Sequence, residues 1–528
     1  MQEFARRSQN ESIKMNKTAV IIISICLTIL FGVPLFFQVD MVEPGFDAKK
    51  VIIISPHNEQ IRHEFGHGFS VWHKNKFNEE VKVVWSVPGG TSEIRRMLQS
   101  QYAHAIESGE EPGGEADLVF GGGSYEHGVL KKKIIKNFDG EEVSTTITIP
   151  APIEPQLLQQ VYGENVIGDI TLYDPDGYWH GLALSGFGIV YNNEVLAELG
   201  VESPQGWEAL CNPQMFGKLA LVNPAQSGSV TTAFEAILKN LGWKKGWQVL
   251  RRAAANARYF SASSLKPPAD VSQGDAAMGI CIDFYGRYQS QAVKSSGGGE
   301  RVGYIDPPSA TMIDPDPISL LRGAPNKAIA LRFIRYCMTP EAQALWQFSA
   351  EEEHQDGLGP DTFDLRRMPV RREMYSKYMD RMVDKVNPYE TAKPAPYPDR
   401  NMRTFIAPLF SAMAMDYHHE LVEAWGAIIR HPSYPKTISL ITSTDVSDPV
   451  LKEMLLEFDK MPKFETDLHN EISMNTAENR KVLKYGWLRD GWKDEGLWSP
   501  EDHGIQEFRR VAARFFQNQY QTVLYTKE

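Results

Sequence analysis

Short apolar runs alternate with amphipathic stretches through the first part of the chain. The run 51–54 is followed by a stretch in which bulky apolar residues recur every three or four positions. The same order returns at 81–98, with a Pro-Gly-Gly loop between the run and the amphipathic stretch. A third run, 117–120, ends in three glycines and a serine. Strand, glycine-rich loop and helix in repeated order predict βαβ units and a largely parallel sheet.

A second group of β-type runs occupies 188–191, 219–222 and 277–282. Each run is followed by a short loop of small or hydrogen-bonding residues. Because the ends of strands in open α/β sheets are where small ligands gather, this layout favours capture of a small polar molecule. We therefore expect binding without covalent chemistry, with no catalytic residue and no cofactor.

The second group of runs also carries an ordered set of motifs. They are Trp207-x-x-Leu210 with Asn212-Pro213, Phe216-Gly217-Lys218, Asn223-Pro224-Ala225 with Ser227-Gly228-Ser229, and Gln273-Gly274-Asp275-Ala276-Ala277. In this order they resemble the second lobe of the extracellular solute-binding proteins of ABC transporters, in the ferric-ion/spermidine-like branch. The resemblance extends over about 51–337. It implies a type II periplasmic-binding-protein fold, a non-enzymatic role in transport, and a membrane permease as partner.

The implied fold class is α/β, with two open sheets in two lobes that are joined by hinge strands near 186–191 and 302–313. The predicted division is 1–44 as a basic tail and membrane segment, 45–185 as the first part of lobe one, 186–300 as lobe two, 301–350 as the return to lobe one, and 351–528 as a C-terminal extension. A proline-rich connector, 387–399, interrupts the extension, and apolar residues recur with helical spacing beyond it. We predict that the extension is mainly helical and packs on lobe one.

The chain begins with the pattern of a membrane anchor. The stretch 18–37 is uncharged and almost wholly apolar, and about 20 residues at about 1.5 Å each cover the roughly 30 Å hydrocarbon core. Basic residues precede it and acidic residues follow it, so the positive-inside rule predicts a cytoplasmic N-terminus and an exported remainder. A cleaved signal peptide is the alternative, although no small-x-small cleavage site follows. We expect an uncleaved signal anchor and a periplasmic or extracytoplasmic location.

Composition limits the class of partner and indicates whether the cysteines form disulfides. The formal net charge of −12 argues against a nucleic-acid partner, because phosphate backbones need a basic face. The four cysteines form no Cys-x-x-Cys pair. Cys26 lies in the apolar segment, which leaves an odd number elsewhere. We expect Cys281 and Cys337, both in apolar runs, to be buried thiols.

Hydroxyl groups and backbone donors at the predicted strand ends form the candidate ligand site. The candidates are Ser55, His57, Asn58, Gly90, Thr91, Gly123, Ser124, Ser227, Gly228, Ser229, Ser263, Ser264, Asp283, Tyr285 and Arg287. Several precede predicted helices, whose N-termini attract anions through free N–H groups and the macrodipole. Arg287 adds a bidentate partner for phosphate or carboxylate, and Asp283 an acceptor for sugar hydroxyls or an ammonium group.

This set predicts a small anionic ligand such as a sugar phosphate or an aminoalkylphosphonate. Two alternatives stay open at this stage. Any one serine or glycine can be an ordinary helix cap or turn residue, and Asp283 and Arg287 can form a salt bridge between the lobes.

Ferric iron is the main alternative ligand. The resemblance places His57 at the metal-ligand histidine of ferric-ion-binding relatives, in which two adjacent tyrosines complete the site. The corresponding residues here are Phe284 and Tyr285. With one phenolate ligand lost, hard ferric binding is disfavoured. We expect no bound metal, with His57 and Tyr285 as ligands only if the iron alternative holds.

A zinc-dependent hydrolase is a further alternative, because 63–67 matches H-E-x-x-H. Helical spacing puts His63 and His67 on one face, with Glu64 as a base and His73 at the position of a third ligand. The two histidines lie far round the helix from the apolar stripe, however. We therefore expect exposed histidines on a surface helix. An anchored sensor or scaffold that keeps the fold without transport is a third hypothesis.

Overall fold

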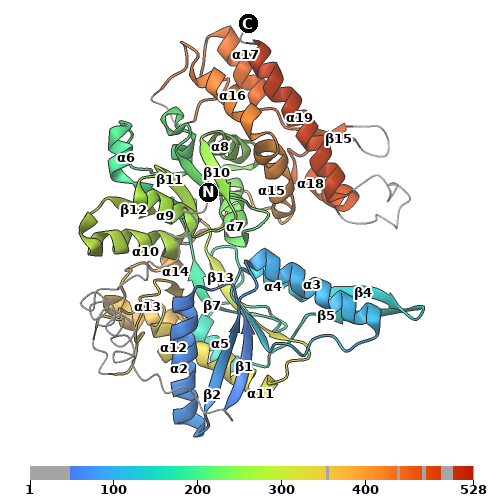
Figure 1. Ribbon diagram of the computed structural model, residues 1–528, viewed down its shortest axis with the longest axis vertical. Helices are drawn as coiled ribbons and strands as arrows, with labels where there is room; N and C mark the ends of the chain where they lie inside the picture. The colour runs from blue at the N-terminus through green and yellow to red at the C-terminus, as the bar shows by residue number, and fades with distance from the viewer. Residues whose placement is uncertain (1–47, 353–355, 437–439, 466–470, 489–503, 527–528) are drawn as a thin grey trace, which may run out of the picture. The chain divides into compact units, whose positions relative to one another are not determined.

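The chain folds around two β-sheets, each of which is covered by helices (Figure 1). The computed structural model describes residues 48–352, 356–436, 440–465, 471–488 and 504–526. The strand order is β14-β7-β13-β3-β1-β2 in the first sheet, with β6 beside β13, and β10-β9-β11-β8-β12 in the second sheet. This confirms the predicted α/β class with two sheets. The predicted membrane segment, 18–37, lies outside the described residues, among which no helix is long and apolar enough to cross a membrane.

Lobe one consists of the first sheet and the helices on its two faces. Its strands are β1 (Lys49–Ile54), β2 (Val81–Ser86), β3 (Leu118–Phe120), β6 (Thr148–Ile149), β7 (His180–Ser185), β13 (Asp314–Leu321) and β14 (Met368–Pro369), and a separate hairpin is formed by β4 (Lys133–Phe138) and β5 (Glu141–Thr146). Its helices are α2 (Glu59–Phe77), α3 (Thr91–Ser108), α4 (Ser124–Leu130), α5 (Pro155–Tyr162), α11 (Lys327–Cys337), α12 (Pro340–Ala344) and α13 (Arg372–Tyr378). Alternate strand residues enter two cores, with Phe120 in the larger core and Val119 in the smaller core.

Helix α2 shows how local sequence builds lobe one. The Asn58 side chain caps it by accepting a hydrogen bond from the Ile61 N–H at 3.1 Å, which satisfies one of the free donors at the helix start. Ile61, Phe65 and Phe69 are buried, as the apolar spacing predicts. The cap and the buried stripe together fix the turn between β1 and α2, and this turn carries His57.

Lobe two consists of the second sheet and its helices. The strands are β8 (Phe187–Asn192), β9 (Leu219–Val222), β10 (Ala257–Ser261), β11 (Met278–Ile282) and β12 (Val302–Ile305), and the helices are α6 (Asn193–Glu198), α7 (Gly228–Leu241), α8 (Trp243–Ala255), α9 (Lys266–Gln273) and α10 (Asp283–Val293). Strand β8 runs antiparallel to both β11 and β12. Cys281 and Cys337 are buried free thiols, as predicted.

The described chain passes between the lobes at three places. Gly186 separates β7 of the first sheet from β8 of the second sheet. Because β12 belongs to the second sheet, the return to lobe one lies at 306–313, slightly later than predicted. The third passage is the proline-rich connector with α14 (Pro388–Thr391), where the Tyr397 N–H donates to the Lys239 carbonyl at 2.9 Å. The C-terminal extension therefore changes lobes part-way along its length.

The end of the extension packs on lobe two, whereas packing on lobe one was predicted. Its helices and strands, here called the C-terminal cap (402–526), are α15 (Met402–Phe410), α16 (His418–Ile429), α17 (Pro449–Phe458), β15 (Lys463–Glu465), β16 (Glu471–Ser473), α18 (Ala477–Leu483) and α19 (Ile505–Thr526). Helix α15 packs on α7 and α16 packs on α8, as Figure 1 shows. Only the first part of the extension, with β14 and α13, joins lobe one. The reason is that both α7 and α8 are buried on more than one side, with mostly apolar residues in α7 and with Gln248, Arg251 and Arg252 in α8, so the sheet alone cannot cover them.

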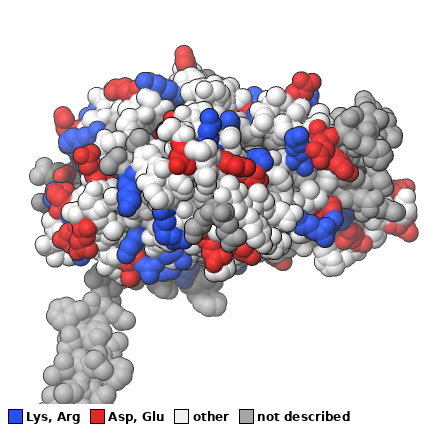
Figure 2. Space-filling view, turned by 90° about the horizontal axis from the view of Figure 1, so that it is seen from above, with Lys and Arg blue, Asp and Glu red and all other residues white. Residues whose placement is uncertain are grey.

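A buried ion pair fastens the cap to lobe two. Arg252 of α8 binds Asp459 through Nη1 at 2.7 Å and Nη2 at 3.1 Å, and its side chain is fully buried. The charges on the surface are exposed to solvent, in contrast to this buried pair, and acidic and basic side chains lie interspersed on the face seen in Figure 2. Exposed pairs of that kind contribute at most about 1 kcal/mol each. The buried pair therefore matters far more to the attachment of the cap than the surface charges do.

Replacing Arg252 tests this attachment. Arg252→Met leaves Asp459 buried without its main partner, so we expect a loss of about 3 to 5 kcal/mol in the free energy of unfolding. Urea titration followed by tryptophan fluorescence measures the loss. Lys245→Met is the matched control, because it removes an exposed pair with Glu208 from the same helix and should cost less than about 1 kcal/mol. Equal losses in the two variants would contradict the assignment.

Candidate functional site

A cavity of about 340 Å³ lies where the two lobes face each other. This volume is in the range of small-ligand sites. Ten predicted site residues line it, namely His57, Gly90, Thr91, Gly123, Ser227, Gly228, Ser229, Ser263, Ser264 and Tyr285. The remaining polar lining includes Ser185, Gln226, Thr232, Asp314, Asp316 and Arg367. The cavity thus collects residues from both lobes and from the start of the C-terminal extension.

Three serine hydroxyls form one wall of the cavity. Ser227 Oγ lies 2.7 Å from Ser264 Oγ and 3.1 Å from Ser229 Oγ, and Ser229 Oγ lies 3.2 Å from Ser264 Oγ. Ser227 also caps α7, whose 14 residues place a helix N-terminus at this wall. Hydroxyl donors at a helix N-terminus favour a bound anion.

Lobe one meets this wall with a second helix N-terminus. Thr91 is the first residue of α3, and its buried Oγ1 has no hydrogen-bond partner within the described part of the chain. At Gly228 a β-carbon would stand 2.4 Å from Thr91 Oγ1, so glycine is required for the lobes to approach this closely. The two helix starts therefore face the same small volume from opposite lobes.

A buried charged group forms another part of the lining. His57 Nε2 donates to Asp316 Oδ2 at 2.7 Å, and Arg367 Nη1 donates to the same oxygen at 2.6 Å. Burial by itself raises the pKa of Asp316, but the charges of Arg367 and His57 outweigh this effect and lower the pKa below its usual value. The Arg367 guanidinium also stacks 4.6 Å from the centre of the Phe284 ring. This arrangement holds a cation at the cavity and keeps the Asp316 carboxylate ionised.

Asp314 supplies the second carboxyl group of the lining. It accepts from Ser124 Oγ at 2.6 Å and from the Ser124 N–H at 3.2 Å. Burial raises the pKa of Asp314 to about 6. Each of its oxygens has a further lone pair, so Asp314 can accept a hydrogen bond from a hydroxyl or ammonium group in the cavity.

Five predicted site residues do not line the cavity. Ser55 Oγ accepts a hydrogen bond from the His57 N–H, Asn58 caps α2, and Ser124 Oγ donates to Asp314. Asp283 and Arg287 act at the crossings between the lobes: Asp283 Oδ2 accepts from the Gly186 N–H at 2.9 Å, and Arg287 pairs with Asp306 at 2.5 Å. Both belong to the first turns of α10, whose other residues Phe284 and Tyr285 line the cavity, whereas Asp283 and Arg287 contact the crossings instead.

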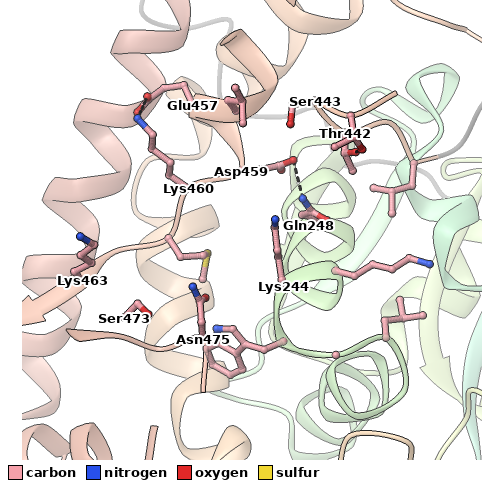
Figure 3. A pocket seen from close by; sticks show the side chains of 18 of the residues that line it. Lys244, Gln248, Thr442, Ser443, Glu457, Asp459, Lys460, Lys463, Ser473 and Asn475 are labelled. Atoms are coloured by element: carbon pink, nitrogen blue, oxygen red, sulfur yellow. Dashed lines mark hydrogen bonds and ion pairs between the residues drawn. The ribbon is translucent and has the colours of Figure 1, made fainter. Parts of the chain in front are cut away.

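A larger cavity of about 1780 Å³ lies between α8 and the C-terminal cap (Figure 3). There Gln248 donates to Asp459 at 2.9 Å, and Lys460 pairs with Glu457. The interlobe cavity differs because two helix N-termini meet there and the buried Thr91 hydroxyl has no hydrogen-bond partner among the described residues. We therefore place the candidate site between the lobes.

Residues 123–351 match the bacterial extracellular solute-binding proteins. This segment holds the serine wall, α4, the first two of the three passages between the lobes and all strands of lobe two. The match supports the solute-binding family without selecting the ferric-ion/spermidine-like branch. It also agrees with a role in capture, because members of such a family bind a solute rather than convert it.

Individual proteins are similar to parts of the chain. A Haemophilus influenzae protein without an assigned function is 24% identical over 262 residues, which cover 48% of this chain and 67% of that protein. The phosphoglycerate transport regulatory protein PgtC of Salmonella typhimurium is 26% identical over 170 residues, which cover 31% of this chain and 39% of PgtC.

Two solved structures are also similar in fold. The periplasmic binding protein AfuA of Actinobacillus pleuropneumoniae, with exogenous fructose-6-phosphate bound, is 15% identical, with a TM-score of 0.46 and coverage of 71% of this chain and 97% of AfuA. Apo ferric ion-binding protein A of Pasteurella haemolytica is 14% identical, with a TM-score of 0.47 and coverage of 71% and 98%.

The interlobe cavity is poorly suited to ferric iron. His57 uses Nε2 to donate to Asp316, and Arg367 Nη1 lies 3.2 Å from that same nitrogen, so a metal ion there would meet a guanidinium. Burial raises the pKa of Tyr285 to about 12, which disfavours the phenolate that ferric iron prefers. Among the described residues no group of three or more His, Cys, Asp or Glu is arranged to hold a metal ion.

The H-E-x-x-H motif has a structural role. Glu64 is buried and accepts the backbone N–H groups of 361–363 at 2.8 to 2.9 Å, so it holds that loop rather than serving as a base. His67 lies 2.9 Å from Asp361 at the surface, with 40% of its side chain exposed. His73 is buried and bonds the Glu79 carbonyl. His63 stacks 6.4 Å from His67, but His73 does not join them, and no group of three metal-ligating residues is arranged to hold an ion within the described part of the chain.

Sequence reasoning missed the charged part of the lining. Asp314 and Asp316 stand two positions apart in a strand, a spacing that puts both on one face, but it indicates a shared site only once that strand is recognised. Arg367 lies beyond the matched segment and carries no local motif. Only the folded chain brings it beside His57.

Asp314 should make stability depend on pH. Because its pKa is raised in the folded state, its contribution to the free energy of unfolding is complete below about pH 4 and is lost as the pH rises through about 6. A shift of this size corresponds to about 2 to 3 kcal/mol. Asp314→Asn keeps the shape but does not titrate. We expect wild type to lose that amount relative to the variant between pH 4 and 7.5 in urea titrations, whereas parallel pH profiles would contradict the assignment.

Proposed function

We propose that this protein is the extracytoplasmic binding component of an ABC importer and that it captures a small phosphate ester or phosphonate between its lobes. The lobes would close on one ligand, and a membrane permease would recognise the closed state. A membrane anchor at 18–37 remains part of this proposal. The observation that carries it is the meeting of two helix N-termini and three serine hydroxyls, from opposite lobes, at one small cavity.

The charges of the cavity support a ligand with two kinds of group. The serine wall and the helix starts of α3 and α7 suit an oxyanion. Asp314 suits a hydroxyl or ammonium group on the same molecule, which is the part that Asp283 was expected to play. A sugar phosphate, a phosphorylated hydroxy acid and an aminoalkylphosphonate all combine these two features.

Ligand identification is the first experiment. The full-length protein is purified without added ligand and examined by native mass spectrometry, and it is then titrated with fructose-6-phosphate, 3-phosphoglycerate and ferric citrate. We expect a co-purified or added phosphorylated compound to bind with one-to-one stoichiometry. Binding of ferric citrate alone would contradict the proposal. Absence of binding to all three compounds, together with no retained cargo, would also contradict it.

The serine wall provides a residue-level test. Ser229→Ala and Ser264→Ala each remove one hydroxyl donor, and we expect each to weaken binding of the phosphorylated compound about tenfold, as for a hydrogen bond to a charged group. Isothermal titration calorimetry measures the change. Ser290→Ala is the matched control, because its hydroxyl bonds the Val302 carbonyl in lobe two, outside the cavity. An unchanged affinity in both wall variants would place the anion elsewhere.

A further inference from the structure

One side chain of the C-terminal cap reaches between the lobes. Arg403, in the first turn of α15, donates through Nη1 to Glu235 Oε2 at 3.0 Å and through Nη2 to Glu126 Oε1 at 3.1 Å. Glu126 belongs to α4 of lobe one, and Glu235 belongs to α7 of lobe two. A single guanidinium thus joins carboxylates of the two lobes, and all three side chains are at least 90% buried.

The charges of this group are balanced. Lys239 also pairs with Glu235, at 3.0 Å, so two cations face two carboxylates. The ring of Tyr125 lies 4.4 Å from the Arg403 guanidinium and covers it. Burial by itself lowers the pKa of Arg403, but Glu126 and Glu235 outweigh this effect and raise the pKa above its usual value. The guanidinium therefore stays charged. Buried groups of this kind are strongly destabilised when one partner is removed.

Arg403 also lies directly behind the serine wall. Nη1 donates to Thr232 Oγ1 at 2.9 Å and Nη2 donates to the Gly228 carbonyl at 3.3 Å. Both Gly228 and Thr232 line the interlobe cavity. The same side chain therefore touches the first turn of α7, which carries the anion-binding wall, and the helix of lobe one that follows Gly123.

We propose that Arg403 is a latch between the lobes, which stabilises the closed arrangement and positions the first turn of α7 at the ligand cavity. Opening the lobes would draw Glu126 away from Glu235, and one guanidinium cannot follow both. Closure and affinity are then set partly by the C-terminal cap, which lies outside the segment shared with solute-binding proteins. The latch rests on the proposed function for its effect on affinity, but its effect on lobe separation can be measured without any ligand.

The distance between the lobes tests the latch directly. Spin labels are placed in the full-length protein at Val71 of α2 and Glu198 of α6, two exposed positions, one in each lobe. Double electron–electron resonance is recorded without ligand for the wild type and for Arg403→Met. We expect the wild type to give a short, narrow distance distribution and the variant to give a broader one with a longer mean. The same distribution in both proteins would overturn the latch.

Matched variants separate the latch from general loss of structure. Arg480→Met removes a comparably buried pair with Asp399, within one side of the molecule, and should leave the lobe distance unchanged. The double variant Glu126→Gln with Arg403→Met avoids an unpaired buried carboxylate, so it should fold and still show the longer distance. A longer distance in Arg480→Met, or a wild-type distance in the double variant, would also overturn the latch.

Affinity provides the link to the proposed function. Arg403→Met should bind the phosphorylated compound identified above roughly tenfold more weakly than the wild type, because part of the binding energy is then spent on closing the lobes. An unchanged affinity would remove the positioning role of Arg403. If the wild type binds no phosphorylated compound at all, the proposed function fails, while the ligand-free distances still decide whether the latch exists.

Discussion

The hydrogen-bonded ladder of β13 with β3 and β7 is the constraint on which the rest of the molecule depends. Strand β13 follows the whole of lobe two in the sequence, yet it lies antiparallel in the centre of the first sheet. Its eight residues are all buried. Because β13 must return to this position, lobe one is discontinuous, and the chain passes to the second sheet after β7 and back to the first sheet before β13. The same return brings Asp314 and Asp316 to the interlobe cavity.

Sequence periodicity predicted the elements that are locally determined, but it could not reveal β13. The strand begins Asp-Pro-Asp-Pro, and prolines argue against a central strand because they cannot donate to the ladder. Here the register shifts between Asp316 and Pro317, and Pro317 contributes its carbonyl instead, accepting from the Gly121 N–H at 2.9 Å. The two aspartates were missed for this reason. By contrast, the apolar stripe of α2 and the Ser-Gly-Ser start of α7 were visible because neighbouring residues determine them.

The candidate site also contains some residues that local sequence predicts and others that only the tertiary structure positions. The residues at helix starts, such as Thr91 and Ser229, were predicted because a cap and an anion site have the same local signature. Asp283 and Arg287 have suitable chemistry, but α10 turns them toward the crossings, and no local pattern encodes that rotation. Arg367 and Arg403 approach the cavity from a segment more than a hundred positions away from the serine wall. Side chains of this kind are determined by tertiary structure alone.

Buried arginines join the late segments of the chain to the two lobes. Arg367 pairs with Asp316 in lobe one, and Arg403 pairs with a carboxylate in each lobe. A guanidinium removed from water requires specific charged or hydrogen-bonding partners, whereas apolar surfaces pack acceptably in several arrangements. These pairs therefore restrict how the extension can lie on the lobes more strongly than apolar packing does. Since Arg367 touches the cavity and Arg403 stands behind its serine wall, the same charges hold the extension in place and shape the interlobe cavity.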